Sequence, residues 1–175
     1  MTQTVLVSLS CPDRTGLVAA VAGALFDLGA NFGDATFAVL GEAAEFNALC
    51  EIPDDVTVEE VHAALAALPE AAGGSLSVTP FALAAVHGPS GRITHRITVS
   101  GGDRPGLIAR LAEVFGQYGA NIVRLNAERV PEGAATRYVV RIAISLSDAG
   151  AAEACLATVS NTAGELGLSC AWETA

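Results

Sequence analysis

Apolar and polar residues change their spacing several times along the first half of this chain, which predicts short strands and helices. Residues 4–9 are β-branched and aliphatic with partial alternation, as in a half-buried strand. Leu17, Val21 and Leu25 then recur at helical spacing, and Asp13 before them is a good N-cap. The pattern further predicts strands over residues 31–40, 45–52 and 75–81, and a second helix that opens on a capping box at Thr57 and Glu60 and runs to Leu68.

The second half of the chain repeats this order of elements. The pattern predicts strands over residues 93–100, 121–130, 136–145 and 168–173, helices over residues 104–118 and 148–166, and a hairpin turn at Pro131-Glu132-Gly133. The order strand, helix, strand, strand, helix, strand is that of a ferredoxin-like module. We therefore expect an α+β protein with two ferredoxin-like βαββαβ modules, each an antiparallel four-stranded sheet with both helices on one face. Ala, Val and Leu on both faces of several strands suggest that the uncovered faces pack on another module.

A direct repeat accounts for the likeness of the two halves. Residues 13–31 align with residues 103–121 without a gap, and nine of the nineteen positions are identical. The period of 90 residues fits a small domain better than a solenoid unit. We expect one domain at residues 1–82, a linker with Gly and Pro at residues 83–92, and a second domain at residues 93–175.

Composition and charge narrow the class of protein. The formal net charge of −10 and only nine basic residues argue against direct nucleic-acid binding, which needs clustered Lys and Arg. No apolar run reaches the roughly 18 residues of a membrane span, so we expect no membrane contact and a cytoplasmic protein. The four cysteines lack zinc-ligand spacing and are expected to be small buried side chains, with no metal or cofactor. The three histidines belong to no catalytic pattern, so the protein is not expected to be an enzyme.

The loop between the first strand and the first helix of each half is the candidate ligand site. Asp13 and Asp103 are expected to cap these helices, whose first N–H groups can hold a ligand carboxylate. Gly16 and Gly106 cost helix stability, so they are expected to let another group approach the backbone closely. A purely structural reading, with Asp as a cap and Gly for packing, explains the same residues and stays open.

Asn31 and Asn121 open the strand that follows each of these helices, and we expect them beside the loop, where their amides can contact the ligand. The two loops differ in sequence, since Gly101-Gly102 stands where the first half has Cys11-Pro12. The double glycine predicts a more open loop in the second half, which is therefore the slightly favoured ligand site.

The motif Asp-Arg-(Thr/Pro)-Gly-Leu, followed by Gly-Ala-Asn within a βαββαβ unit, resembles the ACT domain, a regulatory module that commonly binds amino acids. Two such domains with little else resemble the glycine cleavage system transcriptional repressor family. The resemblance implies ligand-binding positions in each copy, namely Asp13, Arg14, Gly16, Leu17 and Asn31, and Asp103, Arg104, Gly106, Leu107 and Asn121. Some relatives carry a histidine where this chain has Cys11 and Gly101, which leaves the identity of the ligand open.

The resemblance implies a non-catalytic regulatory protein that senses an amino acid or similar metabolite. Because the chain is acidic, repression is expected to act through a DNA-binding protein partner, not through DNA itself. Two alternatives stay open: a ligand-free ACT interaction module, and a detached regulatory subunit of a metabolic enzyme. A homo-oligomer is expected, and the sequence does not decide whether the domains pair within a chain or between chains.

Overall fold

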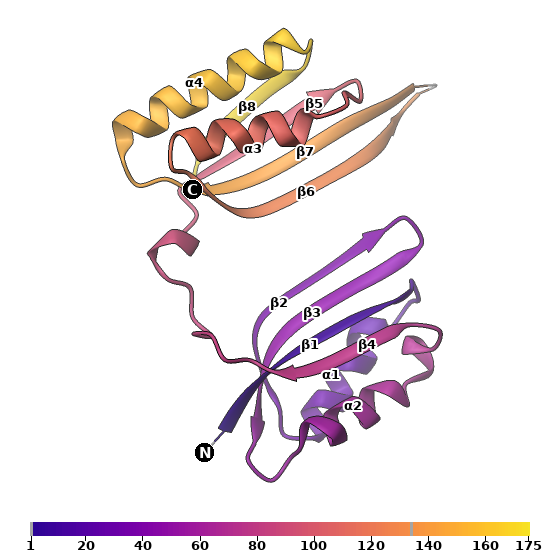
Figure 1. Ribbon diagram of the computed structural model, residues 1–175. Helices are drawn as coiled ribbons and strands as arrows, with labels where there is room; N and C mark the ends of the chain where they lie inside the picture. Colours follow the sequence, from indigo (N-terminus) through magenta and orange to yellow (C-terminus); the bar gives the residue numbers. More distant parts are fainter. Residues whose placement is uncertain (1, 134) are drawn as a thin grey trace. The chain divides into compact units, whose positions relative to one another are not determined.

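A computed structural model of the chain describes residues 2–133 and 135–175 and divides it into two compact units, one up to Val86 and one from His87. Each unit contains one four-stranded antiparallel sheet with two helices on a single face of it (Figure 1). The fold class predicted from the hydrophobic pattern, α+β with two ferredoxin-like modules, is confirmed.

The first unit has the strand order β2-β3-β1-β4. Its elements are β1 (Thr2–Pro12), α1 (Leu17–Asp27), β2 (Asn31–Leu40), β3 (Ala43–Pro53), α2 (Val58–Ala66), the 3₁₀ turn η1 (Pro69–Ala71) and β4 (Ser75–Pro80). Alternate β1 residues, Val5, Val7 and Leu9, are buried with Leu17 and Val21 of α1 in one apolar core. This alternation places one face of the sheet against the helices.

The second unit has the matching order β6-β7-β5-β8. Its elements are the 3₁₀ turn η2 (Pro89–Gly91), β5 (His95–Gly101), α3 (Leu107–Gln117), β6 (Asn121–Glu132), β7 (Ala135–Ser145), α4 (Ala149–Glu165) and β8 (Ser169–Thr174). The predicted turn at Pro131-Glu132-Gly133 is wrong for its first two residues, because Pro131 pairs with Thr136 and Glu132 with Ala135. Proline is tolerated there because β6 is an edge strand.

The predicted capping box of the second helix and the predicted start of the fourth near Asp148 are confirmed, whereas the predicted caps Asp13 and Asp103 are wrong. Thr57 and Glu60 form the complete capping box of α2, and the Asp148 carboxylate accepts a hydrogen bond from the Ala151 N–H at 2.7 Å. Asp13 and Asp103 are not caps. The helices begin at Leu17 and Leu107, and the residue before each is a left-handed glycine: Gly16 has φ 92° and Gly106 has φ 78°.

The faces of the central strands that point away from the helices are largely polar. On β1 they carry Thr4, Leu6, Ser8 and Ser10, paired with Glu51, Leu49, Asn47 and Glu45 of β3. On β5 they carry Arg96, Thr98 and Ser100, paired with Ala143, Arg141 and Val139 of β7. The apolar residues expected on both faces are therefore limited here to Leu6, Leu49, Ala143 and Val139. Among the described residues, no helix is both long and apolar enough to cross a membrane.

Candidate functional site

The loop from β1 to α1 in the first unit borders an open hollow of about 850 Å³. The Asp13 N–H donates to the Glu42 carbonyl at 2.9 Å, which holds the loop against the β2–β3 turn. The hollow is lined by Ser10, Cys11, Pro12, Asp13, Leu40, Gly41, Glu42, Ala43 and Gly73. Its volume is in the range of small-molecule sites, and its charged side chains are the carboxylates Asp13 and Glu42.

The arginine of the repeated motif binds backbone carbonyls in both units. Arg14 Nη1 donates to the Pro69 and Glu70 carbonyls at 2.8 and 3.0 Å, just after α2. Arg104 Nε donates to the carbonyl of Leu166, the C-cap of α4, at 3.2 Å. In each unit the arginine therefore ties the loop to the segment at the end of the second helix, which is the turn η1 in the first unit and the C-cap of α4 in the second.

The leucine and glycine of the motif also have structural explanations. Leu17 and Leu107 are 1% and 2% exposed and belong to the two cores. Gly16 and Gly106 lie in the left-handed region that other residues rarely adopt. In the described part of the chain no heavy atom lies within 4 Å of the place where a Cβ would stand on either glycine, apart from their own chain neighbours. Backbone conformation is thus the reason for glycine here, and the open space remains accessible to a ligand.

The expectation that Asn31 and Asn121 lie beside these loops is wrong. Asn31 pairs with Glu51, which pairs with Thr4, whereas the Asp13 loop follows Pro12 at the other end of β1. Eight strand residues separate the two positions, or roughly 26 Å at about 3.3 Å per residue. In the second unit Asn121 likewise lies at the His95 end of the sheet, and its Nδ2 donates to the Ser90 carbonyl at 2.8 Å.

Asp103 lies in an ion pair, whereas its counterpart Asp13 has none with residues 2–133 or 135–175. Arg129 Nη2 on β6 donates to Asp103 Oδ2 at 2.7 Å, and its guanidinium lies 6.0 Å from the centre of the Tyr138 ring. The hydrogen bond to Asp103, and then the charge of that carboxylate, raise the pKa of Arg129. A ligand ammonium that binds Asp103 therefore has to displace Arg129, whereas one that binds Asp13 does not.

The second loop is not the more open one. A Cβ on Gly101 would lie 2.5 Å from Leu168 Cδ2, so the leucine side chain fills the room that this glycine provides. In the first unit the arrangement is reversed, since a Cβ on Gly74 would lie 2.6 Å from the Cys11 Cβ. The hollow beside the second loop measures about 350 Å³, less than half the first.

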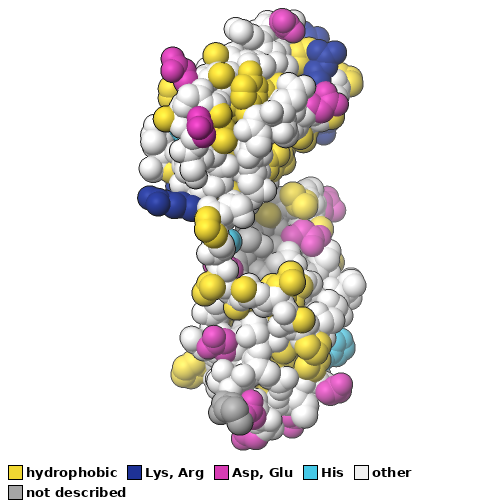
Figure 2. All heavy atoms as spheres, turned by 60° about the vertical axis from the view of Figure 1, so that its left-hand side comes forward, with side chains coloured by type: hydrophobic (Ala, Val, Ile, Leu, Met, Phe, Trp, Pro, Cys, Tyr) yellow, Lys and Arg dark blue, Asp and Glu magenta, His cyan; other side chains and the backbone are white. Residues whose placement is uncertain are grey.

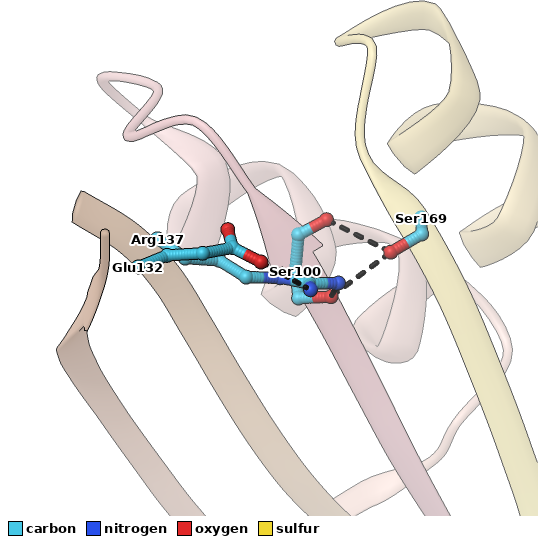
Figure 3. Close-up of polar contacts among 4 residues, drawn as sticks. All are labelled: Ser100, Glu132, Arg137 and Ser169. Carbon is cyan, nitrogen blue, oxygen red and sulfur yellow. Dashed lines mark hydrogen bonds and ion pairs between the residues drawn. The ribbon is translucent and has the colours of Figure 1, made fainter. Parts of the chain in front are cut away.

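A polar network at this second hollow has no counterpart in the predicted site residues (Figure 3). Arg137 Nη2 on β7 donates to Ser100 Oγ at 2.7 Å, and Ser100 Oγ lies 2.9 Å from Ser169 Oγ on β8. Glu132 Oε1 lies 3.6 Å from Arg137 Nη1. The three strands are far apart in the sequence, and an isolated Arg in a strand gives no signal of such a contact.

The cysteines are poor candidates for chemistry. Burial raises the pKa of each of the four thiols, and it raises the pKa of Cys50 to about 11. A thiol with a raised pKa is mostly protonated near neutral pH and is a weak nucleophile. Among the described residues, no group of three or more His, Cys, Asp or Glu side chains is arranged to hold a metal ion.

Family models for the ACT domain match residues 3–79 and residues 95–161, which together span most of the chain. The chain belongs to the ACT-domain family. An unknown protein from Galdieria sulphuraria is similar over 100% of this chain and 99% of its own, with 24% identity and a TM-score of 0.76. A candidate glycine cleavage system transcriptional repressor is similar over 100% and 98%, with 15% identity and a TM-score of 0.68. Both likenesses concern the fold, and no curated protein matches the sequence.

The two ACT domains differ sharply in charge. The unit up to Val86 contains eleven acidic residues and one basic residue, which accounts for the whole net charge of −10. The unit from His87 contains eight of each and is formally neutral. On the face of the molecule shown in Figure 2, the dark-blue basic side chains lie on the second unit. The first ACT domain therefore repels anions, and the second does not.

Proposed function

We propose that this chain is a non-catalytic regulatory protein that binds an amino acid or a similar small metabolite and acts through a protein partner. The proposal is supported above all by the loop and hollow of the first ACT domain. There an exposed aspartate, Asp13, stands beside a hollow of about 850 Å³ and next to the left-handed Gly16. An aspartate in such a place can accept the ammonium group of a ligand.

The motif residues divide into ligand contacts and structural supports under this proposal. Asp13 and Asp103 are the ligand contacts, because their side chains are exposed and do not cap the helices. Arg14, Leu17 and their counterparts position the loop from behind. Asn31 contacts the ligand only if it belongs to a site at the opposite end of the sheet, or to one completed by another domain.

The same proposal gives the chain a role in transcription, as its resemblance to glycine cleavage system repressors implies. The formal charge of −10 on the first ACT domain opposes contact with DNA phosphates. Repression therefore acts on a DNA-binding activator, which the ACT protein binds in one ligand state and releases in the other. A ligand that shifts this equilibrium must bind one of the two states more tightly.

Calorimetry of the full chain with a panel of free amino acids tests the proposal. We expect saturable binding of at least one amino acid with Kd between about 1 μM and 1 mM, the range of metabolite sensing. The variants Asp13→Ala and Asp103→Ala should weaken it, and Asp27→Ala, at the far end of α1, should not. If no amino acid of the panel binds, the result would favour the alternative of a ligand-free interaction module. Recovery of a metabolic enzyme, not a transcription factor, on affinity purification would favour the detached regulatory subunit.

A further inference from the structure

The hydroxyl groups at the second hollow form a chain with one consistent direction. Ser169 Oγ donates to the Ser100 carbonyl at 3.0 Å, so the hydroxyl proton of Ser100 is directed at Ser169 Oγ. Ser100 Oγ in turn accepts the 2.7 Å hydrogen bond from Arg137 Nη2. Ser100 is 9% exposed, so the acceptor that holds the guanidinium is itself fixed in the sheet. The network orients Arg137 before any ligand arrives.

Arg137 keeps unused donors that face open space. A guanidinium has five N–H groups, and in the described residues only Ser100 accepts one within hydrogen-bond distance. Glu132 forms a looser contact at 3.6 Å, and its side chain is 64% exposed. Hollows of about 350 and 340 Å³ border Arg137, and both are also lined by Ser100 and Glu132.

The equivalent position in the first ACT domain has the opposite character. Ser10 and Ser75 pair across β1 and β4 as Ser100 and Ser169 pair across β5 and β8. There, however, Ser10 Oγ donates at 2.6 Å to the Glu45 carboxylate. The same corner of the fold thus offers a carboxylate in the first domain and an oriented guanidinium in the second.

We propose that the hollow lined by Ser100, Gly102, Glu132, Thr136, Arg137 and Ser169 binds a small monoanionic carboxylate, held by Arg137. The planar guanidinium matches a carboxylate in a two-point contact, and Thr136 is among the residues that line the same hollow. One arginine next to Glu132 offers too little positive charge for a dianion such as phosphate. The proposal rests on the proposed function, since it assigns the carboxylate end of an amino-acid ligand to this hollow.

Ser100 and Glu132 have distinct parts in this site. Ser100 is a positioning residue, because its hydroxyl is engaged by Arg137 and Ser169 and acts on the ligand through the guanidinium that it holds. Glu132 competes with the ligand for Arg137 Nη1, so its neutralisation should strengthen binding. Variants of Ser100 and of Glu132 should therefore change the affinity for the carboxylate in opposite directions.

A titration followed by nuclear magnetic resonance of the full chain tests the site, with acetate, glycine and inorganic phosphate as probes at constant ionic strength. Acetate and glycine should cause saturable shifts of the Gly102 and Thr136 amides and of the Arg137 Nε–H signal, and phosphate should bind more weakly. Arg137→Ala should weaken acetate binding by about 10- to 100-fold, the loss of a charged hydrogen-bonding partner. Arg96→Ala, on the same face of β5, should leave it unchanged.

Further variants distinguish the loss of a ligand contact from a general loss of folding. Arg137→Gln keeps much of the side-chain volume and should lose binding equally. Glu132→Gln should strengthen acetate binding by up to about fivefold, the equivalent of an exposed ion pair. Ser100→Ala should weaken it, and Ser100→Thr, which retains the hydroxyl, should restore it.

The outcomes separate this site from the proposed function. Amino-acid binding that survives Arg137→Ala and Arg137→Gln would overturn the site and leave the regulatory role intact. Acetate binding that depends on Arg137, with no amino acid bound in calorimetry, would support the carboxylate site and overturn the proposed function as an amino-acid sensor. Unlocalised shifts, or tighter binding of phosphate than of acetate, would overturn the carboxylate proposal.

Discussion

The side chain of Leu168 fills the space beside Gly101: a Cβ on the glycine would stand 2.5 Å from Cδ2 of the leucine. Leu168 is only 7% exposed and belongs to the core of the second ACT domain. In the first domain the glycine is instead Gly74, just before β4, and it makes room for Cys11 on β1. The two copies thus keep the same fit at this corner with the glycine and the side chain exchanged.

The variant Gly101→Ala should therefore destabilise the second domain by about 1–3 kcal/mol, the usual range for overpacking a core. Leu168→Ala should cost about 2 kcal/mol or more, because it removes a buried side chain. The double variant should lose less than the sum of the two, since Leu168→Ala removes the clash that Gly101→Ala creates. Urea unfolding of the three variants measures this coupling. Strict additivity would show that Gly101 is required for its backbone conformation alone.

Gly16 gives a second test, because the α1 helix contains a matched control. Gly16 has φ 92°, so Gly16→Ala should cost about 1 kcal/mol or more through backbone strain. Gly23 lies inside α1 with no heavy atom of the described residues, beyond its own helix turn, within 4 Å of a Cβ position. Gly23→Ala should therefore stabilise the domain by about 0.5–1 kcal/mol. Thermal unfolding of both variants should show shifts of opposite sign, and equal shifts would contradict the left-handed turn.

Hydrophobic spacing and capping chemistry predicted most of the fold. Residues 31–40 were predicted as a strand with the observed bounds, and the capping box at Thr57 was predicted with its partner. These features depend on residues close in sequence, where period and turn chemistry suffice. The start of α1 was misplaced because Asp13 is a good N-cap by type, whereas the chain uses the left-handed Gly16 instead.

The candidate site was less predictable, because it depends on strand register. Asn31 follows α1 in the sequence, but the helix carries the chain back along the sheet to the Thr4 end of β1. The hydrogen bond from Arg137 to Ser100 joins residues 37 apart in the sequence, and the one between Ser100 and Ser169 joins residues 69 apart, so no local pattern encodes this network. The total charge of −10 likewise does not show that the first domain is strongly acidic and the second neutral.

Two aspartates of the second domain should differ in their effect on stability. Asp148 caps α4 through the Ala151 N–H at 2.7 Å, so Asp148→Ala should cost about 1 kcal/mol. Asp103 caps no helix, and its solvent-exposed pair with Arg129 should contribute much less to stability than the cap. Added salt should reduce the effect of Asp103→Ala because it screens the pair. Denaturation of both variants without ligand, at low and high salt, measures the difference. A larger loss of stability for Asp103→Ala than for Asp148→Ala would show that Asp103 does cap α3.

The buried thiol of Cys50 should make the first ACT domain sensitive to alkaline pH. Burial raises its pKa from 9.0 to about 11, because the folded domain disfavours the thiolate. A pKa that is raised on folding stabilises the folded state below the unfolded value, and this contribution is lost as the pH rises towards the folded value. The free energy of unfolding should therefore fall between about pH 9 and pH 11.

The first domain isolates this effect, because residues 1–86 contain no Tyr or Lys that would titrate in the same window. Cys11 also has a pKa raised by burial, so it should account for part of the pH dependence. Cys50→Ala should make the decline between pH 9 and pH 11 shallower, whatever its cost at neutral pH. Urea unfolding followed through the amide signals of β1 at each pH provides the two slopes. Parallel slopes for Cys50→Ala and the unaltered chain would exclude Cys50 as the titrating group.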